Sequence, residues 1–146
     1  MTTVRELVES TAEVLGDRVQ ARWLVEVAVS ADQLDEVLDE DVTERMVAHL
    51  DSMVGRYRTG EPLQYVLGRW AFRHLDLFVD QRVLIPRPET EEVAGVAIEF
   101  AKLVTSDRTV IDLGTGSGAI GLSLAYELPL DGTSVWMTDV SAEALD

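Results

Sequence analysis

The chain is 146 residues long and combines 12 Lys and Arg with 27 Asp and Glu, which gives a formal net charge of −15 at pH 7. Such a charge repels phosphate backbones and argues against broad, direct nucleic-acid binding. With 47% hydrophobic residues, no Cys and no apolar run of about 20 residues, the composition predicts a self-folding cytoplasmic protein without disulfides, thiolate metal sites or a membrane span.

The first part of the chain shows helical periodicity. Residues 4–15 repeat apolar side chains at helical spacing and precede Gly16, a typical helix C-cap. Asp17 can cap a second helix, and Thr43 can open a longer third one. We therefore predict that residues 1–68 form a helical bundle, the first part of an α+β two-part chain.

The pattern then changes to that of an extended connection. Residues 70–79 mix aromatic and branched residues in a near-alternating order that suits a hairpin. Pro86 and Pro88 then prevent a helix from running through this point. We expect residues 69–88 to form a hairpin linker and residues 89–146 to begin a second domain.

The second domain has the pattern of one βαβ unit. After a helix over residues 89–104, we expect a strand at 109–112, a glycine-rich loop at 114–118, a helix at 119–127 and a strand at 134–139. This order is typical of the start of a Rossmann-like parallel sheet, and we expect Trp136 to lie in its core. By this count the chain is a two-domain protein cut off after its second strand.

The glycine-rich loop is the strongest candidate for a ligand site. Gly114, Gly116 and Gly118 follow a buried strand and precede a helix, whose free N–H groups and positive dipole favour anionic or hydrogen-bonding ligand groups. Asp139 lies 21 residues beyond Gly118, at the end of the next strand. Because neighbouring parallel strands end at the same edge of a sheet, Asp139 can accept hydrogen bonds from the two hydroxyls of a ribose.

Two nucleotide cofactors compete for this loop. Gly116, Gly118 and Gly121 match the dinucleotide fingerprint, which favours a nicotinamide-dependent oxidoreductase. Asp112, at the end of the first strand, would repel a pyrophosphate, whereas it suits the cationic ammonium and sulfonium groups of S-adenosylmethionine. We expect Asp112 to bind the cofactor electrostatically or through a water molecule. A strand-to-helix turn that binds no ligand is the third alternative.

The sequence resembles the release factor glutamine methyltransferases, in their amino-terminal portion. The resemblance covers nearly the whole chain and rests on four segments, namely residues 60–68 (GEPLQYVLG), 84–91 (LIPRPETE), 112–120 (DLGTGSGAI) and Asp139 with 141–145. It implies a class I methyltransferase sheet, S-adenosylmethionine as cofactor, and transfer of a methyl group to the glutamine of the Gly-Gly-Gln motif in peptide chain release factors.

The resemblance also implies residue roles. The loop residues Gly114, Thr115, Gly116, Ser117 and Gly118 would surround the methionine part of the cofactor. Asp139 would hold the ribose, and Arg87 and Thr90 would lie beside the cofactor. The helical domain would recognise the release factor, the protein partner.

No catalytic residue is assigned in this chain. The family's Asn-Pro-Pro-Tyr motif, which is implied to orient the reacting amide, does not occur in the sequence, so the 146-residue chain is expected to be inactive alone. The two histidines are far apart in sequence and suggest no metal site. The alternatives are another class I methyltransferase acting on nucleic acid or a small molecule, and a partner-binding fragment without catalysis.

A basic segment lies between two acidic ones. Residues 55–87 contain six arginines and three acids, whereas residues 1–54 contain four arginines and 13 acids. Either these six arginines pair with neighbouring acids, or some of them contact the release factor, for which Arg69 and Arg73 are the candidates.

Overall fold

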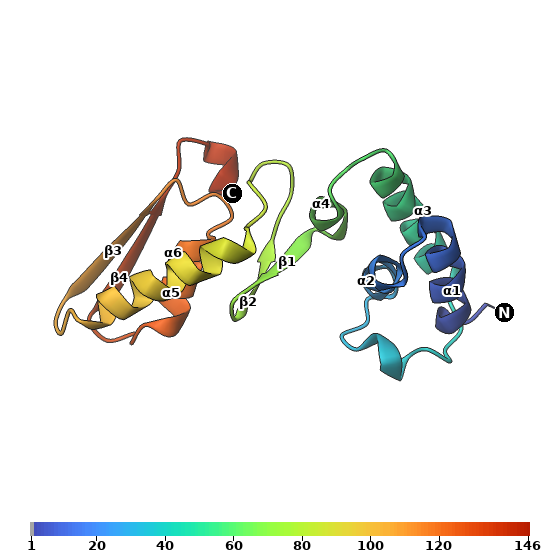
Figure 1. The fold of residues 1–146 in the computed structure, drawn as a ribbon, viewed down its shortest axis with the longest axis horizontal. Coiled ribbons are helices and arrows are strands. Elements are labelled where there is room, and N and C mark those ends of the chain that lie inside the picture. Colours follow the sequence, from blue (N-terminus) through green and yellow to red (C-terminus); the bar gives the residue numbers. More distant parts are fainter. Residues whose placement is uncertain (1) are drawn as a thin grey trace. The chain divides into compact units, whose positions relative to one another are not determined.

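The computed structural model describes residues 2–146 and divides the chain into two compact units, one ending at Leu67 and one comprising Gly68–Asp146. The first unit is helical, and the second contains a hairpin and a βαβ unit (Figure 1). The α+β fold class expected from the sequence is therefore confirmed.

The helical unit contains four α-helices and one 3₁₀ turn among its described residues. They are α1 (Val4–Leu15), α2 (Arg18–Val29), η1 (Leu34–Glu36), α3 (Glu44–Arg58) and α4 (Leu63–Leu67). The helix boundaries follow local capping, since Asp17 accepts hydrogen bonds from the N–H groups of Val19 and Gln20 at the start of α2. Gly16 ends α1 with φ 71°, a left-handed conformation that suits glycine.

One apolar core holds the helical unit together. The buried stripes of α1, α2 and α3 meet there, and η1 and α4 each add one buried side chain; Leu24 and Val25 of α2 are fully buried. Because each amphipathic helix buries its apolar face against the others, tertiary packing stabilises helices that are too short to be stable in isolation.

The second unit begins with an antiparallel hairpin. Strand β1 (Arg69–Phe72) pairs with β2 (Leu75–Phe78) in the register Phe72↔Leu75, which leaves Arg73 and His74 as a two-residue turn. Phe72 and Leu77 are buried. The predicted hairpin is confirmed, and the later part of the predicted linker, residues 79–87, belongs to no strand of the described chain.

A βαβ unit follows helix α5 (Pro88–Lys102). Strand β3 (Arg108–Leu113), helix α6 (Ala119–Glu127) and strand β4 (Thr133–Thr138) come in that order, with β3 and β4 paired in parallel. Arg87 precedes α5 as its N-cap residue, and Pro88 takes the first helical position, where its missing N–H is not needed. Ser141 caps the final 3₁₀ turn η2 (Ala142–Ala144).

The two faces of the β3–β4 sheet differ. Helices α5 and α6 lie against one face, where Ile98, Leu124 and Leu128 form a core with Val110 and Val135 (Figure 1). On the opposite face, which no described element covers, Ile111 is 58% exposed, Leu113 78% and Trp136 63%. The expectation that Trp136 lies in the core is therefore wrong, because its strand places it on the uncovered face.

No helix among residues 2–146 is both long enough and apolar enough to cross a membrane.

Candidate functional site

The glycine-rich loop connects the end of β3 to the start of α6 through three left-handed residues. Gly114, Gly116 and Gly118 have φ values of 76°, 53° and 78°, which side chains rarely permit. The N–H groups of Gly114 and Thr115 both donate to the carbonyl of Thr138 on β4, at 2.8 and 2.9 Å. The loop is thus held against the end of the neighbouring strand.

The glycines of this segment have two different surroundings. A Cβ atom added at Gly114 or Gly116 would meet no atom within 4 Å, so there is open space beside this half of the loop. At Gly118 it would lie 2.8 Å from Leu122 Cδ1, and at Gly121 2.5 Å from Met137 Cγ. The first two glycines therefore leave room for a ligand, while Gly118 makes room for Leu122 of the same helix and Gly121 allows close packing of α6 against Met137 of β4.

Asp139 is bonded directly to the loop. Its Oδ2 accepts a hydrogen bond from the Gly116 N–H at 2.9 Å, and its Oδ1 accepts one from the Ser141 N–H at 2.9 Å. These bonds, first that from Ser141 and then that from Gly116, lower the pKa of Asp139 below the usual range for aspartate. The side chain is therefore an anion at neutral pH, and each oxygen retains capacity to accept a further bond.

Asp112 also bonds within the loop. Its Oδ2 accepts hydrogen bonds from Thr115 Oγ1 at 2.7 Å and from the Gly121 N–H at 2.9 Å. The N-cap residue of α6 is Gly118, which has no side chain, so Asp112 provides the capping acceptor from the preceding strand. A structural task of this kind was not predicted from the sequence, and cofactor binding by Asp112 remains a prediction.

The remaining predicted site residues lie at the start of α5, in the same unit. Arg87 is exposed and Thr90 half-buried, and the Thr90 N–H donates to the Arg87 carbonyl at 2.9 Å. Within residues 2–146, neither side chain hydrogen-bonds to the glycine loop. The structure thus joins Asp112, Asp139 and the loop into one network and leaves the role of Arg87 and Thr90 a prediction.

A small hollow beside the loop involves residues that the sequence did not single out. It measures about 180 Å³ and is lined by Ser117 of the loop together with Phe78, Asp80, Arg82, Val83, Glu143, Ala144 and Asp146. The Arg82 guanidinium lowers the pKa of Asp80, to which it is bonded at 2.9 Å. The segment that follows the hairpin therefore borders the candidate site, although no motif in it signals this.

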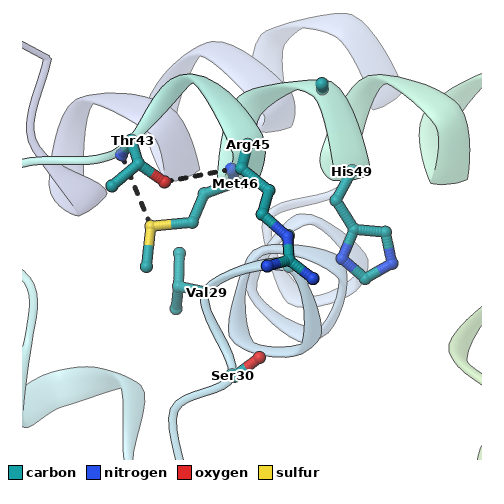
Figure 2. Close-up of a pocket in the computed structure, with 8 residues that line it drawn as sticks. Val29, Ser30, Thr43, Arg45, Met46 and His49 are labelled. Carbon is teal, nitrogen blue, oxygen red and sulfur yellow. Dashed lines mark hydrogen bonds between the residues drawn. The ribbon is translucent and has the colours of Figure 1, made fainter.

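The helical unit has a larger hollow of about 760 Å³ between the end of α2 and the start of α3. Its lining is mostly small or apolar, and it consists of Ala28, Val29, Ser30, Thr43, Arg45, Met46, Ala48 and His49. Figure 2 shows the side chains of Arg45 and His49 on one side of α3, directed toward the end of α2. This hollow was not predicted from the sequence.

Among the residues that the structure describes, no group of three or more His, Cys, Asp or Glu side chains is arranged to hold a metal ion.

Comparison with known proteins gives two family matches. Residues 6–68 match the family model described as PrmC N-terminal domain, and residues 89–145 match the one described as Lysine methyltransferase. The second match contains the glycine loop and both site aspartates.

Curated relatives extend this similarity to most of the chain. The release factor glutamine methyltransferase of Gloeobacter violaceus is 38% identical over 133 residues, which are 88% of this chain and 45% of the relative. That of Staphylococcus aureus is 34% identical over 132 residues, or 89% and 46%. That of Chlorobaculum tepidum is 48% identical over 91 residues, or 60% and 30%.

The fold and the loop together define the class, a helical domain followed by the first βαβ unit of a Rossmann-like methyltransferase sheet. Over most of its length the chain is similar to the release factor glutamine methyltransferases, as its sequence indicated. It spans a little under half the length of the first two curated relatives it matches.

Proposed function

We propose that this chain contributes the cofactor-binding loop and the recognition domain of an enzyme that transfers a methyl group from S-adenosylmethionine to the glutamine side-chain amide in the Gly-Gly-Gln motif of release factors. The observation that supports it best is the Asp139 carboxylate bonded to Gly116 at 2.9 Å, beside the open space at Gly114 and Gly116. The glutamine acceptor is taken from the name of the curated relatives. The activity is proposed for the full-length protein.

The donor set of the loop fits S-adenosylmethionine. Asp139 can accept bonds from ribose hydroxyls while it keeps its bonds to Gly116 and Ser141, since a carboxylate oxygen has two lone pairs. Asp112 adds a second carboxylate at the same edge of the sheet, which favours a cationic ligand over a pyrophosphate. When bound, the cofactor supplies an electrophilic methyl group.

This chain's own residues would hold the cofactor and supply no proton acceptor. The loop N–H groups and the two carboxylates bind and orient it, and Gly114 and Gly116 allow its close approach. We assign no catalytic residue here, and the orientation of the acceptor amide is left to other parts of the full-length protein.

Calorimetric titration tests the cofactor. We expect the full-length protein to bind S-adenosylhomocysteine, and Asp139→Ala to weaken that binding by about tenfold or more, because a charge-assisted hydrogen bond contributes about 1.5–3 kcal/mol. Binding of NAD with equal or higher affinity would instead support the oxidoreductase alternative.

Methyl transfer to a purified release factor tests the acceptor. The curated relatives are named as glutamine methyltransferases, whereas the family model that matches residues 89–145 is described as Lysine methyltransferase. We expect labelled methyl groups from the cofactor to appear on the release factor and to disappear when the Gly-Gly-Gln glutamine is replaced by Asn. Label that persists on lysine after this change would contradict the proposal.

The helical unit is the proposed recognition domain, and the hollow between α2 and α3 is its candidate contact. Four arginines lie within residues 2–54, the described part of the acidic first segment. Arg5, Arg18 and Arg22 each pair with a carboxylate there, whereas Arg45 pairs with none. An unpaired guanidinium beside an apolar floor suits an acidic side chain of a partner protein.

The charge-reversing change Arg45→Glu should weaken release factor binding and leave S-adenosylhomocysteine binding unchanged. Arg18→Glu is the matched control, because Arg18 is exposed and already paired with Glu9. Equal affinity for the release factor in both variants would exclude the hollow as a contact.

A further inference from the structure

Arg73 occupies an unusual place in the hairpin turn. It is the first of the two turn residues and has φ 51°, a left-handed conformation that favours glycine at this position. A residue with a side chain is disfavoured there, because its Cβ atom lies too close to the following carbonyl oxygen. Interactions of the arginine side chain must offset this cost.

The Arg73 guanidinium binds two helices of the second unit, α5 and α6. Its Nε and Nη2 donate to the two carboxylate oxygens of Glu127 at 2.7 and 2.8 Å, and its Nη1 donates to the carbonyl of Glu91 at 2.9 Å. Glu127 is the last residue of α6, and Glu91 lies in the first turn of α5. One side chain thus joins the hairpin turn to both helices.

The Arg73–Glu127 ion pair is largely buried and bidentate. The Arg73 side chain is 20% exposed and that of Glu127 17%. Hydrogen bonding to Arg73 lowers the pKa of Glu127, so the carboxylate is charged at neutral pH. Bidentate pairs of this kind fix orientation more strictly than exposed single contacts.

Helix α5 leaves room for the guanidinium at Gly95. A Cβ atom added there would lie 3.1 Å from Arg73 Nη1, tighter than an ordinary contact. Glycine in a helix interior is less favourable than alanine, because it loses more backbone freedom on folding. The presence of Gly95 beside Arg73 is therefore explained by the contact it permits.

The hairpin is where the helical unit joins the second unit. Helix α4 ends at Leu67 and β1 begins at Arg69, so a single residue, Gly68, connects them. Helix α6 ends at Glu127, the partner of Arg73, and its other end follows directly after the glycine loop, with Gly118 as the N-cap residue. Arg73 therefore fixes the strand pair that follows the helical unit to the helix that follows the cofactor loop.

We propose that Arg73 is a positioning residue, which clasps the hairpin to α5 and α6 so that the helical recognition unit is attached to a rigid base. This rests on the proposed function, since it concerns how a protein substrate held by the helical unit reaches the cofactor. It also disfavours the alternative that Arg73 contacts the release factor, because its guanidinium is occupied within the second unit.

Two variants break the clasp in different ways. Arg73→Gly removes the guanidinium while it suits the left-handed turn, so the fold should be retained. Gly95→Ala keeps Arg73 and crowds its Nη1. Gly55→Ala is the matched control, because Gly55 also lies in a helix interior and an added Cβ there meets nothing within 4 Å.

In the full-length protein we expect Arg73→Gly to raise the KM for the release factor about ten- to a hundredfold. Gly95→Ala should raise it less, and Gly55→Ala not at all. The Kd for S-adenosylhomocysteine should stay within about twofold in all three, because the loop network contains none of these residues. Hydrogen exchange of the hairpin amides should accelerate in Arg73→Gly.

An unchanged KM in both clasp variants would overturn the proposal. A loss of S-adenosylhomocysteine binding as large as the rise in KM would also overturn it, because Arg73 would then merely support the glycine loop. If the unsubstituted protein methylates no release factor, the proposed function fails. The clasp itself is still tested by the hairpin amides, and unchanged exchange in Arg73→Gly would refute it.

Discussion

The helical unit and the βαβ part bury their apolar residues differently. In the helical unit, the stripes of α1, α2 and α3 all end in one core, where Leu24 and Val25 are fully buried. In the βαβ part, the strands alternate between a face covered by α5 and α6 and a face on which Trp136 stays 63% exposed. Apolar residues that look equivalent in the sequence thus contribute very unequally to stability.

The difference shows what each part requires for folding. A helix bundle satisfies its apolar faces through neighbours in the chain, so local periodicity identifies its core. A strand of a two-faced sheet needs a covering layer on each side. The open face of β3 and β4 is therefore the surface on which further packing would add most to this unit.

The largest expected effect is in the helical core. Leu24→Ala should lower the free energy of unfolding of the helical unit by about 2–5 kcal/mol, because it removes buried methyl groups and leaves a cavity. Urea denaturation, with hydrogen exchange to assign the loss to this unit, measures it. A loss below about 1 kcal/mol would mean that the core is less tightly packed than described.

Asp112→Ala tests a cap supplied from a distant strand. We expect a loss of about 1–3 kcal/mol in the second unit without any ligand, because the change removes the acceptor for Gly121 N–H and Thr115 Oγ1. Asp17→Ala, which removes a local cap from α2, should cost the helical unit about 1 kcal/mol. If Asp112→Ala changes only cofactor binding, the capping role is wrong.

Acid should weaken the second unit more than the first. The pKa values of Asp80, Glu127 and Asp139 are all lowered in the second unit, whereas Glu61 is the one such carboxylate described in the first. A lowered pKa in the folded state stabilises the protein above the ordinary pKa of the group, and this contribution is lost as the pH falls.

Stability of the second unit should therefore decline from about pH 4 downward. Hydrogen exchange of each unit across this range measures the decline, and Glu127→Gln should make it shallower. A steeper decline in the helical unit would reverse the comparison.

The smallest expected effect is on the open sheet face. Trp136→Thr should change the free energy of unfolding by less than about 0.5 kcal/mol, because the side chain is largely exposed and Thr suits a strand. Thermal unfolding of the 146-residue chain measures it. A loss comparable to that of Leu24→Ala would show that this face is covered in solution.

The sequence predicted those parts of the fold that depend on local signals. Helices α1 and α6 begin and end, and α2 begins, where periodicity and caps place them. Helix α4 was missed because its five residues are too few to show a period. Trp136 was misplaced because strand alternation does not reveal whether a face is covered.

The candidate site shows the same division. The alternation of the glycines and the spacing to Asp139 predicted that these groups meet at one edge of the sheet, and the Gly116 N–H does donate to Asp139 Oδ2. The capping role of Asp112 and the clasp at Arg73 were not predictable, because each depends on pairing between segments distant in sequence. Arg73 and Glu127 are 54 residues apart.

The four glycines at 114, 116, 118 and 121 also determine what a survey of sequence variation can reveal. Substitutions at 118 and 121 collide with Leu122 or Met137 whether or not a ligand binds, so selection for folding alone would preserve glycine there. At 116, an added side chain points into open space, and the backbone conformation is its main obstacle. Tolerance of Asn at 116 but not at 121 would therefore be the mark of a protein that has kept its fold and given up its cofactor.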